Sequence, residues 1–237
     1  MNDDNLYSLF ESRFPADRSR PLLHCENGRV VSYGEAEAIA SRYAAFLAGL
    51  GLEPGARVAV QVEKSPEALL VYLGCLKAGL AYLPLNSAYQ EGEVGYFLEN
   101  AEAGAVIAQP KSLPWLAPLT RKLGIRHVFS LDENGQGTFV EAARGGVETF
   151  ATVPREADDL AAILYTSGTT GRSKGAMISH RNLASNARVL HAHWGFRADD
   201  VLIHMLPLFH VHGLFVASHR VLMNGTAMRF HAKFDAR

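Results

Sequence analysis

A regular alternation between short apolar segments and helical segments limits the fold of this sequence more than any other feature. The pattern predicts strands at 57–62, 81–85, 104–108 and 126–131, and helices at 65–79, 91–100, 114–123 and 138–144. Strands that are apolar throughout are typical of sheets buried on both faces. We therefore expect an α/β protein whose mixed or parallel β-sheets are flanked by helices.

Signals at the ends of segments support this division. Ser32 and Glu35 have the spacing of a capping box, and apolar residues then recur at helical spacing as far as Gly49. The later part of the chain predicts strands at 160–165, 176–178 and 201–206, a helix at about 180–194, and a strand-like segment within 226–237. We expect 1–150 to form a first α/β subdomain, followed by a second part at 151–237.

Composition and charge exclude several classes of function. The 237 residues are 48% hydrophobic, with 23 basic and 24 acidic side chains, so no surface for nucleic acid is expected. Cys25 and Cys75 form no close-spaced pair, which favours reduced thiols over a disulfide framework. No segment is long and apolar enough to span a membrane, and the first residues lack a signal-peptide pattern, so we expect a cytoplasmic protein.

The polar segment after the apolar run at 160–165 has the composition of a phosphate-binding loop. Its glycines let the backbone approach an anion, its hydroxyls donate hydrogen bonds, and its lysine supplies positive charge. The expected nucleotide-binding residues are Thr166, Ser167, Gly168, Thr169, Thr170, Gly171, Arg172, Ser173, Lys174 and Gly175.

This loop has two other interpretations. A nucleoside-triphosphatase P-loop needs glycine directly before its lysine, Ser or Thr directly after it, and then a helix. Here Ser173 precedes Lys174, Gly175 follows it, and an apolar segment comes next, so we expect a strand, a loop and a second strand. An ordinary polar hairpin loop remains the alternative.

Eight of the ten histidines lie in the last quarter of the chain, which raises the question of a metal site. His191 and His193 fall on a predicted helix, where residues two apart point in nearly opposite directions. His210 and His212 could share a metal only on extended chain, and no nearby carboxylate or cysteine completes a ligand set. We therefore expect no metal ligands here, and interpret most of these histidines as core or surface residues.

The loop at 166–175 resembles the signature phosphate-binding loop of the adenylate-forming acyl-CoA synthetase superfamily. Three further stretches resemble motifs of that superfamily in the expected order, at 31–47, 76–86 and 206–214. Within it, the chain is most similar to the malonyl-CoA synthetases, through the sequences Gly-Arg-Ser-Lys at 171–174, Phe-His-Val-His-Gly-Leu-Phe at 209–215 and Lys-Phe-Asp at 233–235.

This resemblance implies an activity and roles for individual residues. Members join an acid to coenzyme A through an acyl-adenylate. They use ATP with Mg²⁺, and ATP is converted to AMP and pyrophosphate. Lys174 would contact the phosphates as a catalytic residue, and Arg172 could screen pyrophosphate or face water. His210 resembles the catalytic histidine beside the acid and the α-phosphate, and His212 is a weaker candidate for contact with the substrate.

The resemblance covers the N-terminal portion of these enzymes, which are about twice as long. The family's ribose-binding aspartate, metal-associated acid and mobile C-terminal lid domain with its lysine have no counterpart here, so we expect a fragment. The expected function is malonyl-CoA formation by the whole enzyme. The alternatives are a synthetase for another small acid, a truncated non-catalytic subunit that binds nucleotide or a partner, and a histidine-based metallohydrolase.

Overall fold

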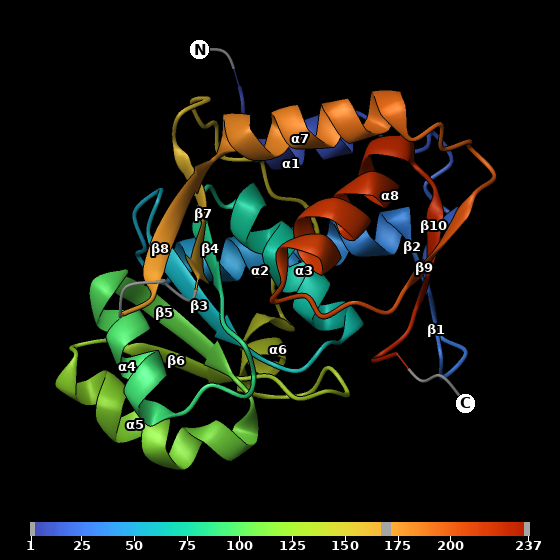
Figure 1. Ribbon diagram of the computed structural model, residues 1–237. Helices are drawn as coiled ribbons and strands as arrows, with labels where there is room; N and C mark the ends of the chain where they lie inside the picture. The colour runs from blue at the N-terminus through green and yellow to red at the C-terminus, as the bar shows by residue number, and fades with distance from the viewer. Residues whose placement is uncertain (1–2, 167–171, 235–237) are drawn as a thin grey trace.

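The structure, a computed structural model, describes residues 3–166 and 172–234. Its strands form two sheets (Figure 1). The six-stranded sheet has the order β6-β5-β3-β4-β7-β8 and contains β3 (Arg57–Gln61), β4 (Ala81–Pro84), β5 (Ala103–Ala108), β6 (His127–Ser130), β7 (Leu160–Thr166) and β8 (Lys174–Ser179). The four-stranded sheet has the order β2-β1-β10-β9 and contains β1 (Pro21–Cys25), β2 (Val30–Ser32), β9 (Val201–His204) and β10 (Ala227–Phe230).

Helices connect most of these strands. They are α1 (Leu6–Glu11), α2 (Tyr33–Gly49), α3 (Pro66–Lys77), α4 (Glu91–Asn100), the 3₁₀-helix η1 (Pro110–Ser112), α5 (Leu113–Lys122), α6 (Thr138–Ala143), α7 (His180–His193), the π-helix η2 (His212–Ser218) and α8 (His219–Asn224). In the part of the chain that the structure describes, no helix has the length and apolar character needed to cross a membrane.

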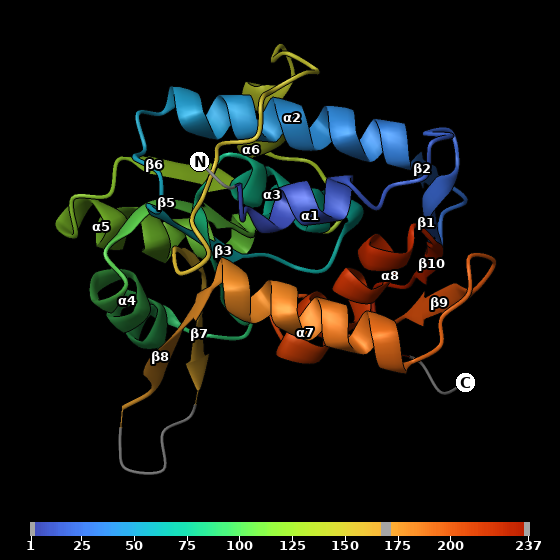
Figure 2. The same cartoon turned by 90° about the horizontal axis from the view of Figure 1, so that it is seen from above.

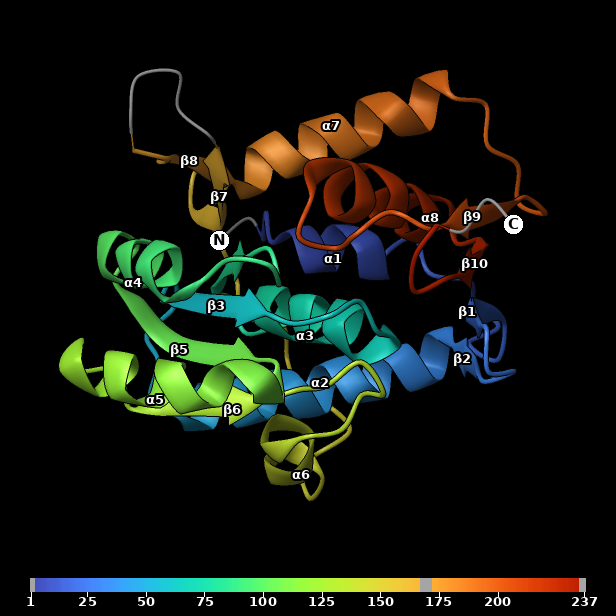
Figure 3. The same ribbon diagram turned by 60° about the horizontal axis from the view of Figure 1, so that its bottom comes forward.

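The six-stranded sheet confirms the predicted α/β class. Its strands from β6 to β7 pair in parallel, and β8 pairs antiparallel with β7, so the sheet is mixed. Side chains alternate between its two faces: Val58 and Val60 of β3 join the larger core with α2 and α3, whereas Ala59 joins the smaller core with α4 and α5. Helices therefore cover both faces of the sheet (Figure 2 and Figure 3).

The four-stranded sheet brings the two ends of the described chain together. β1 pairs in parallel with β10, with Leu23 opposite Met228, and β10 pairs in parallel with β9. The hydroxyl of Tyr33, the first residue of α2, donates a 2.7 Å hydrogen bond to the carbonyl of Thr226. Each sheet contains strands from both sides of residue 150, so the two predicted segments share their sheets.

Most predicted strands of the six-stranded sheet, and the helices between them, agree with the structure within a few residues. The predicted start of α2 is also confirmed, because the hydroxyl of Ser32 accepts a 3.1 Å hydrogen bond from the Glu35 N–H. The prediction of strand at 201–206 was too long. The strand ends at His204 because the buried His204 side chain bonds the carbonyl of Gly213 and the chain turns away from the sheet. In 226–237, only Ala227–Phe230 forms a strand among the described residues.

Candidate functional site

The predicted phosphate-binding loop joins the last two strands of the six-stranded sheet. β7 ends at Thr166, β8 begins at Lys174, and these two residues are directly paired in the antiparallel ladder. The predicted strand, loop and strand are therefore confirmed, and no helix follows the lysine as a P-loop requires. Ser167, Gly168, Thr169, Thr170 and Gly171 lie outside the described residues.

The two ends of the loop present a hydroxyl beside a cation. Thr166 and Lys174 are both exposed, and paired residues of antiparallel strands project on the same face with their Cβ atoms about 5 Å apart. A Cβ at Gly175, the next residue, would lie 3.1 Å from Ile163 and 3.2 Å from the Tyr165 ring, so this position has little room for a side chain. The strand pair can thus offer a donor and a positive charge to one anion.

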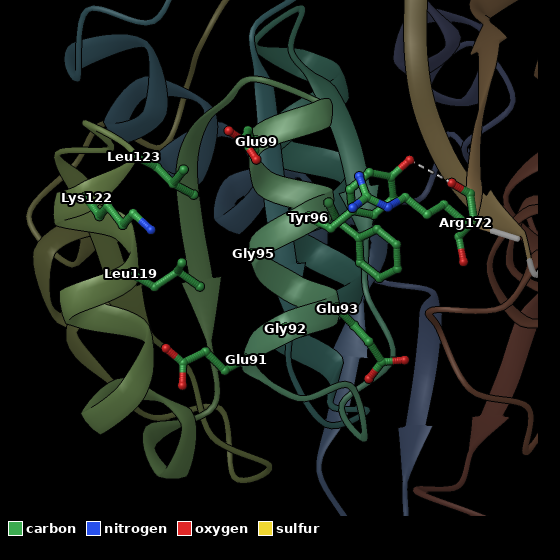
Figure 4. A pocket seen from close by; sticks show the side chains of 12 residues that line it. Glu91, Gly92, Glu93, Gly95, Tyr96, Glu99, Leu119, Lys122, Leu123 and Arg172 are labelled. Carbon is green, nitrogen blue, oxygen red and sulfur yellow. Dashed lines mark hydrogen bonds between the residues drawn. The ribbon is translucent and has the colours of Figure 1, made fainter.

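Helix α4 supports the second end of the loop (Figure 4). The hydroxyl of Tyr96 donates a 2.9 Å hydrogen bond to the carbonyl of Ser173, and the guanidinium of Arg172 lies 5.4 Å from the centre of the Tyr96 ring. These residues line a groove of about 900 Å³ between α4 and α5. In this structure the exposed Arg172 side chain lies over Tyr96 at the edge of that groove.

The same helix also supports the first end of the loop. The ring of Tyr165, next to last in β7, lies 4.2 Å from the ring of Phe97. Its hydroxyl donates a 2.7 Å hydrogen bond to the side-chain carbonyl of Asn100. Burial raises the pKa of Tyr165, so the hydroxyl remains a donor near neutral pH. One helix therefore fixes both strands at the points where they enter and leave the loop.

The sequence did not predict this role for Tyr96. The only signal was an aromatic pair, Tyr96 and Phe97, in a helix of which Phe97 faces the core and Tyr96 is partly exposed. Periodicity explains the buried Phe97 but gives no reason for a tyrosine beside it. That reason comes from the carbonyl of Ser173, 77 residues further along the chain.

His210 lies in the connection between β9 and the π-helix η2, and His212 is the first residue of η2. Both are exposed, and their rings are stacked with centroids 5.3 Å apart and an angle of 21° between the planes. The backbone N–H of His212 donates a 3.4 Å hydrogen bond to Nδ1 of His210, which leaves Nε2 of His210 as the free donor in its neutral form. Within residues 3–166 and 172–234, no group of three His, Cys, Asp or Glu residues could hold a metal ion.

Three other histidines are core residues, one of the two environments expected for most of the histidines. His180, His204 and His219 have at most 1% of their surface exposed. Nδ1 of His180 accepts a 3.0 Å hydrogen bond from the N–H of Leu6 at the start of α1, and Nε2 of His219 lies 2.7 Å from the hydroxyl of Tyr72. Burial lowers the pKa of His180 to about 4 and that of His219 to about 3, so both are neutral near pH 7.

The predicted residues thus form two groups. Thr166 and Lys174 lie together at the hairpin, and His210 lies just before η2 with its ring stacked on that of His212, the first residue of η2. Helix α7 begins directly after β8 and contacts both β8 and η2, so a single helix connects the elements that carry the two groups.

Comparison with known proteins gives a consistent result. The family model described as AMP-binding enzyme matches residues 10–237. The structure of apo MatB from Rhodopseudomonas palustris superposes with a TM-score of 0.94 and 47% sequence identity, covering 99% of this chain and 46% of that chain.

Among curated relatives, the malonate–CoA ligase of Arabidopsis thaliana is 30% identical over 188 residues, covering 79% of this chain and 31% of that protein. Tyrocidine synthase 3 of Brevibacillus parabrevis is 33% identical over 199 residues, covering 84% of this chain and 3% of that protein. The chain spans less than half the length of each of these relatives. The predicted family is confirmed because its model matches almost the whole chain. The chain therefore belongs to the family of AMP-binding enzymes.

Proposed function

We propose that the protein containing this chain is an ATP-dependent acid–thiol ligase that forms malonyl-CoA from malonate, ATP and coenzyme A. The observation that carries this proposal is the 47% identity to MatB over 99% of the chain, together with the match to a malonate–CoA ligase. A solved structure of MatB with ATP bound superposes equally well, with a TM-score of 0.94. Family membership alone does not determine the acid, because a tyrocidine synthase and a crotonobetaine/carnitine–CoA ligase also match this chain.

The chemistry explains why such an enzyme needs a phosphate-binding loop. A carboxylate is a poor electrophile, so one malonate oxygen first attacks the α-phosphorus of ATP while the bond to the β-phosphate oxygen breaks. This step gives malonyl-adenylate and pyrophosphate. The thiol of coenzyme A then attacks the acyl carbon, loses its proton, and displaces AMP. The first step brings an anion to a polyanion, which is unfavourable unless the protein places positive charge and hydrogen-bond donors around the phosphates.

In this proposal the hairpin binds the β- and γ-phosphates. Lys174 supplies the charge, and the hydroxyl of Thr166 supplies a donor beside it, supported by their direct pairing across β7 and β8. The remaining residues of 166–175 would complete the site with hydroxyl and backbone N–H donors. Anchoring of Tyr165 and Ser173 on α4 would keep these donors in place before ATP arrives.

His210 is proposed to orient the attacking malonate oxygen. Its exposed ring has a free Nε2, since Nδ1 already accepts from the backbone of His212. A neutral imidazole with Nε2 protonated can donate a hydrogen bond to a carboxylate. His212, stacked on His210, is the weaker candidate for contact with the substrate.

The described residues do not form a protein cage for Mg²⁺. They contain no group of three suitable side chains, and Mg²⁺ commonly keeps several waters and is held by substrate phosphates with few protein ligands. In this proposal Mg²⁺ therefore enters as part of the nucleotide substrate, and none of the roles above depends on it.

A second candidate is a ligase for another small acid. It is favoured by the crotonobetaine/carnitine–CoA ligase of Escherichia fergusonii, which is 28% identical over 230 residues and matches 92% of this chain.

Product analysis with the protein expressed from its complete reading frame tests both candidates. Malonate, ATP and coenzyme A should give malonyl-CoA with AMP and pyrophosphate. Formation of ADP and phosphate would contradict adenylation. Preference for acetate or a bulkier acid over malonate would contradict only the identity of the acid.

A further inference from the structure

We propose that Lys64 and His204 are positioning residues that hold the loop at 205–211, which carries His210, in its working position. This inference rests on the proposed function only where it assigns His210 to the acid. Neither residue touches a reacting group in this proposal, and both act through the backbone of the loop. The evidence is a set of hydrogen bonds that use every polar atom of the His204 side chain.

His204 is the last residue of β9 and is 1% exposed. Its Nδ1 lies 2.8 Å from Nζ of Lys64, and its Nε2 lies 2.9 Å from the carbonyl of Gly213 and 3.0 Å from Oγ of Ser218. A carbonyl can only accept, so Nε2 carries the proton and Nδ1 accepts from Lys64. The contacts therefore determine the tautomer of His204 on both sides of the ring.

The bond from His204 to Gly213 closes the loop that contains His210. The two residues are nine positions apart, and the intervening chain leaves the sheet and returns to the start of η2. A Cβ at Gly213 would lie 2.1 Å from the carbonyl oxygen of Pro207, so the chain makes a close crossing that only glycine permits. The backbone carbonyl of His210 accepts a 3.0 Å hydrogen bond from the N–H of Leu214, the residue after Gly213. The backbone of His210 is therefore bonded to the chain next to this close crossing.

Lys64 connects this loop to the other sheet. It lies in the segment that joins β3, a strand of the six-stranded sheet, to helix α3. Its Nζ also donates a 2.9 Å hydrogen bond to the backbone carbonyl of His204. The ammonium group lies 4.5 Å from the centre of the Phe230 ring at the end of β10. Lys64 therefore contacts the side chain and the backbone of His204, and its ammonium group also lies over the ring of Phe230 on the neighbouring strand β10.

The charges around the pair favour a neutral histidine. Burial and the nearby Lys64 lower the pKa of His204 to about 4. Burial lowers the pKa of Lys64 to about 7, with the Glu26 carboxylate opposing this shift. Because His204 stays neutral well below pH 7, its Nδ1 remains an acceptor for Lys64 under ordinary conditions.

Kinetics on the protein from the complete reading frame test the proposal. Lys64→Met keeps the length of the side chain but removes the donor. Loss of the two hydrogen bonds that join Lys64 to His204 corresponds to roughly a ten- to hundredfold change. We expect a loss of that size in kcat for malonate-dependent pyrophosphate exchange, with KM for ATP changed less than about threefold. Lys111→Met is the control, because Lys111 follows the neighbouring strand β5 and is exposed, with its Nζ 3.6 Å from Oε1 of Glu63.

Variants of His204 separate positioning from packing. His204→Gln retains a donor and an acceptor and should keep more activity than His204→Leu, which fills the space without hydrogen bonds. Ser218→Ala removes one partner of Nε2 without changing charge and should give a smaller loss. Equal activity of the Gln and Leu variants, or an unchanged kcat in Lys64→Met, would overturn the proposal.

Nitrogen NMR of histidine-labelled protein provides a measurement that does not depend on activity. Wild-type His204 should show the tautomer with a protonated Nε2, assigned through its disappearance in His204→Gln. Lys64→Met should shift the Nδ1 resonance of His204 and the signals of His210. An unchanged His210 spectrum would contradict the proposed link to the loop. Absence of exchange activity in wild-type protein would contradict the proposed function, whereas these shifts would still decide the inference.

Discussion

The hydroxyl of Tyr96 on α4 donates a 2.9 Å hydrogen bond to the carbonyl of Ser173, the residue directly before β8. This contact attaches the lysine end of the phosphate-binding loop to a helix that packs on the six-stranded sheet. Tyr165 attaches the opposite end to the same helix through Asn100. The two ends of the loop are therefore held by one helix.

Replacing Tyr96 with phenylalanine should weaken ATP binding. The change removes one hydrogen bond to the loop, and a neutral hydrogen bond contributes about 0.5–1.5 kcal/mol, so KM for ATP should rise about two- to tenfold. Malonate KM should change little. Tyr89→Phe is the matched control, since Tyr89 precedes α4 and packs on Phe97, with ring centroids 5.2 Å apart. An equal effect in both variants would contradict a specific role for the contact with Ser173.

Stability should decrease as the pH falls below about 6.5. His180, His204 and His219 are neutral in the folded protein, with pKa values lowered to about 4, 4 and 3. In the unfolded chain the same histidines bind protons near pH 6.5. Their contribution to the free energy of unfolding is therefore complete above that pH and is lost as the pH approaches 4.

Between about pH 4 and 6.5, each of these histidines changes the free energy of unfolding by about 1.4 kcal/mol per pH unit. Urea unfolding between pH 4 and 8 measures the slope. His219→Phe should reduce it even though the variant is less stable overall, because the hydroxyl of Tyr72 loses its partner. His193→Gln on the exposed surface of α7 should leave the slope unchanged. A pH-independent wild type would contradict the burial of these histidines in neutral form.

The 237-residue chain by itself should fold but should not catalyse pyrophosphate exchange. It matches 46% of the length of MatB, and its described residues include only the two ends of the proposed phosphate-binding loop and His210, which is proposed to orient the acid. With several contacts of about 1 kcal/mol each missing, the ATP dissociation constant should approach the millimolar range. Calorimetric titration measures this affinity. Rapid malonate-dependent exchange by this chain alone would show that its residues suffice for catalysis.

Local patterns were sufficient to predict much of the six-stranded sheet. Apolar strands such as the one at 160–165 and helix caps such as Ser32 depend on a few neighbouring residues, and a single sequence displays them directly. The predicted hairpin followed from the order of apolar and polar residues around Lys174, and the structure agrees.

Features that depend on distant residues were not predictable in this way. β1 pairs with β10, so a strand near the N-terminus has its parallel partner strand more than 200 residues later in the sequence. The short helix α1 depends on His180, whose Nδ1 accepts from the Leu6 N–H. Lys64 has no unusual sequence context, and only the folded chain places its Nζ against His204.

The role of Lys174 is the central claim for the site. Lysine would meet the leaving pyrophosphate only during adenylation, so Lys174→Ala should slow that step about ten- to hundredfold, by the usual contribution of a charge-assisted contact. Thioester formation from supplied malonyl-adenylate should be affected much less. Lys122→Ala is the control, because Lys122 is an exposed lysine on α5 across the groove from α4.

Malonate-dependent exchange of labelled pyrophosphate into ATP tests this claim most directly, using protein from the complete reading frame. We expect exchange by the wild type and by Lys122→Ala, with a loss of about ten- to hundredfold in Lys174→Ala at saturating ATP. Exchange that is unaffected by Lys174→Ala, or absent from the wild type with every acid supplied, would contradict it.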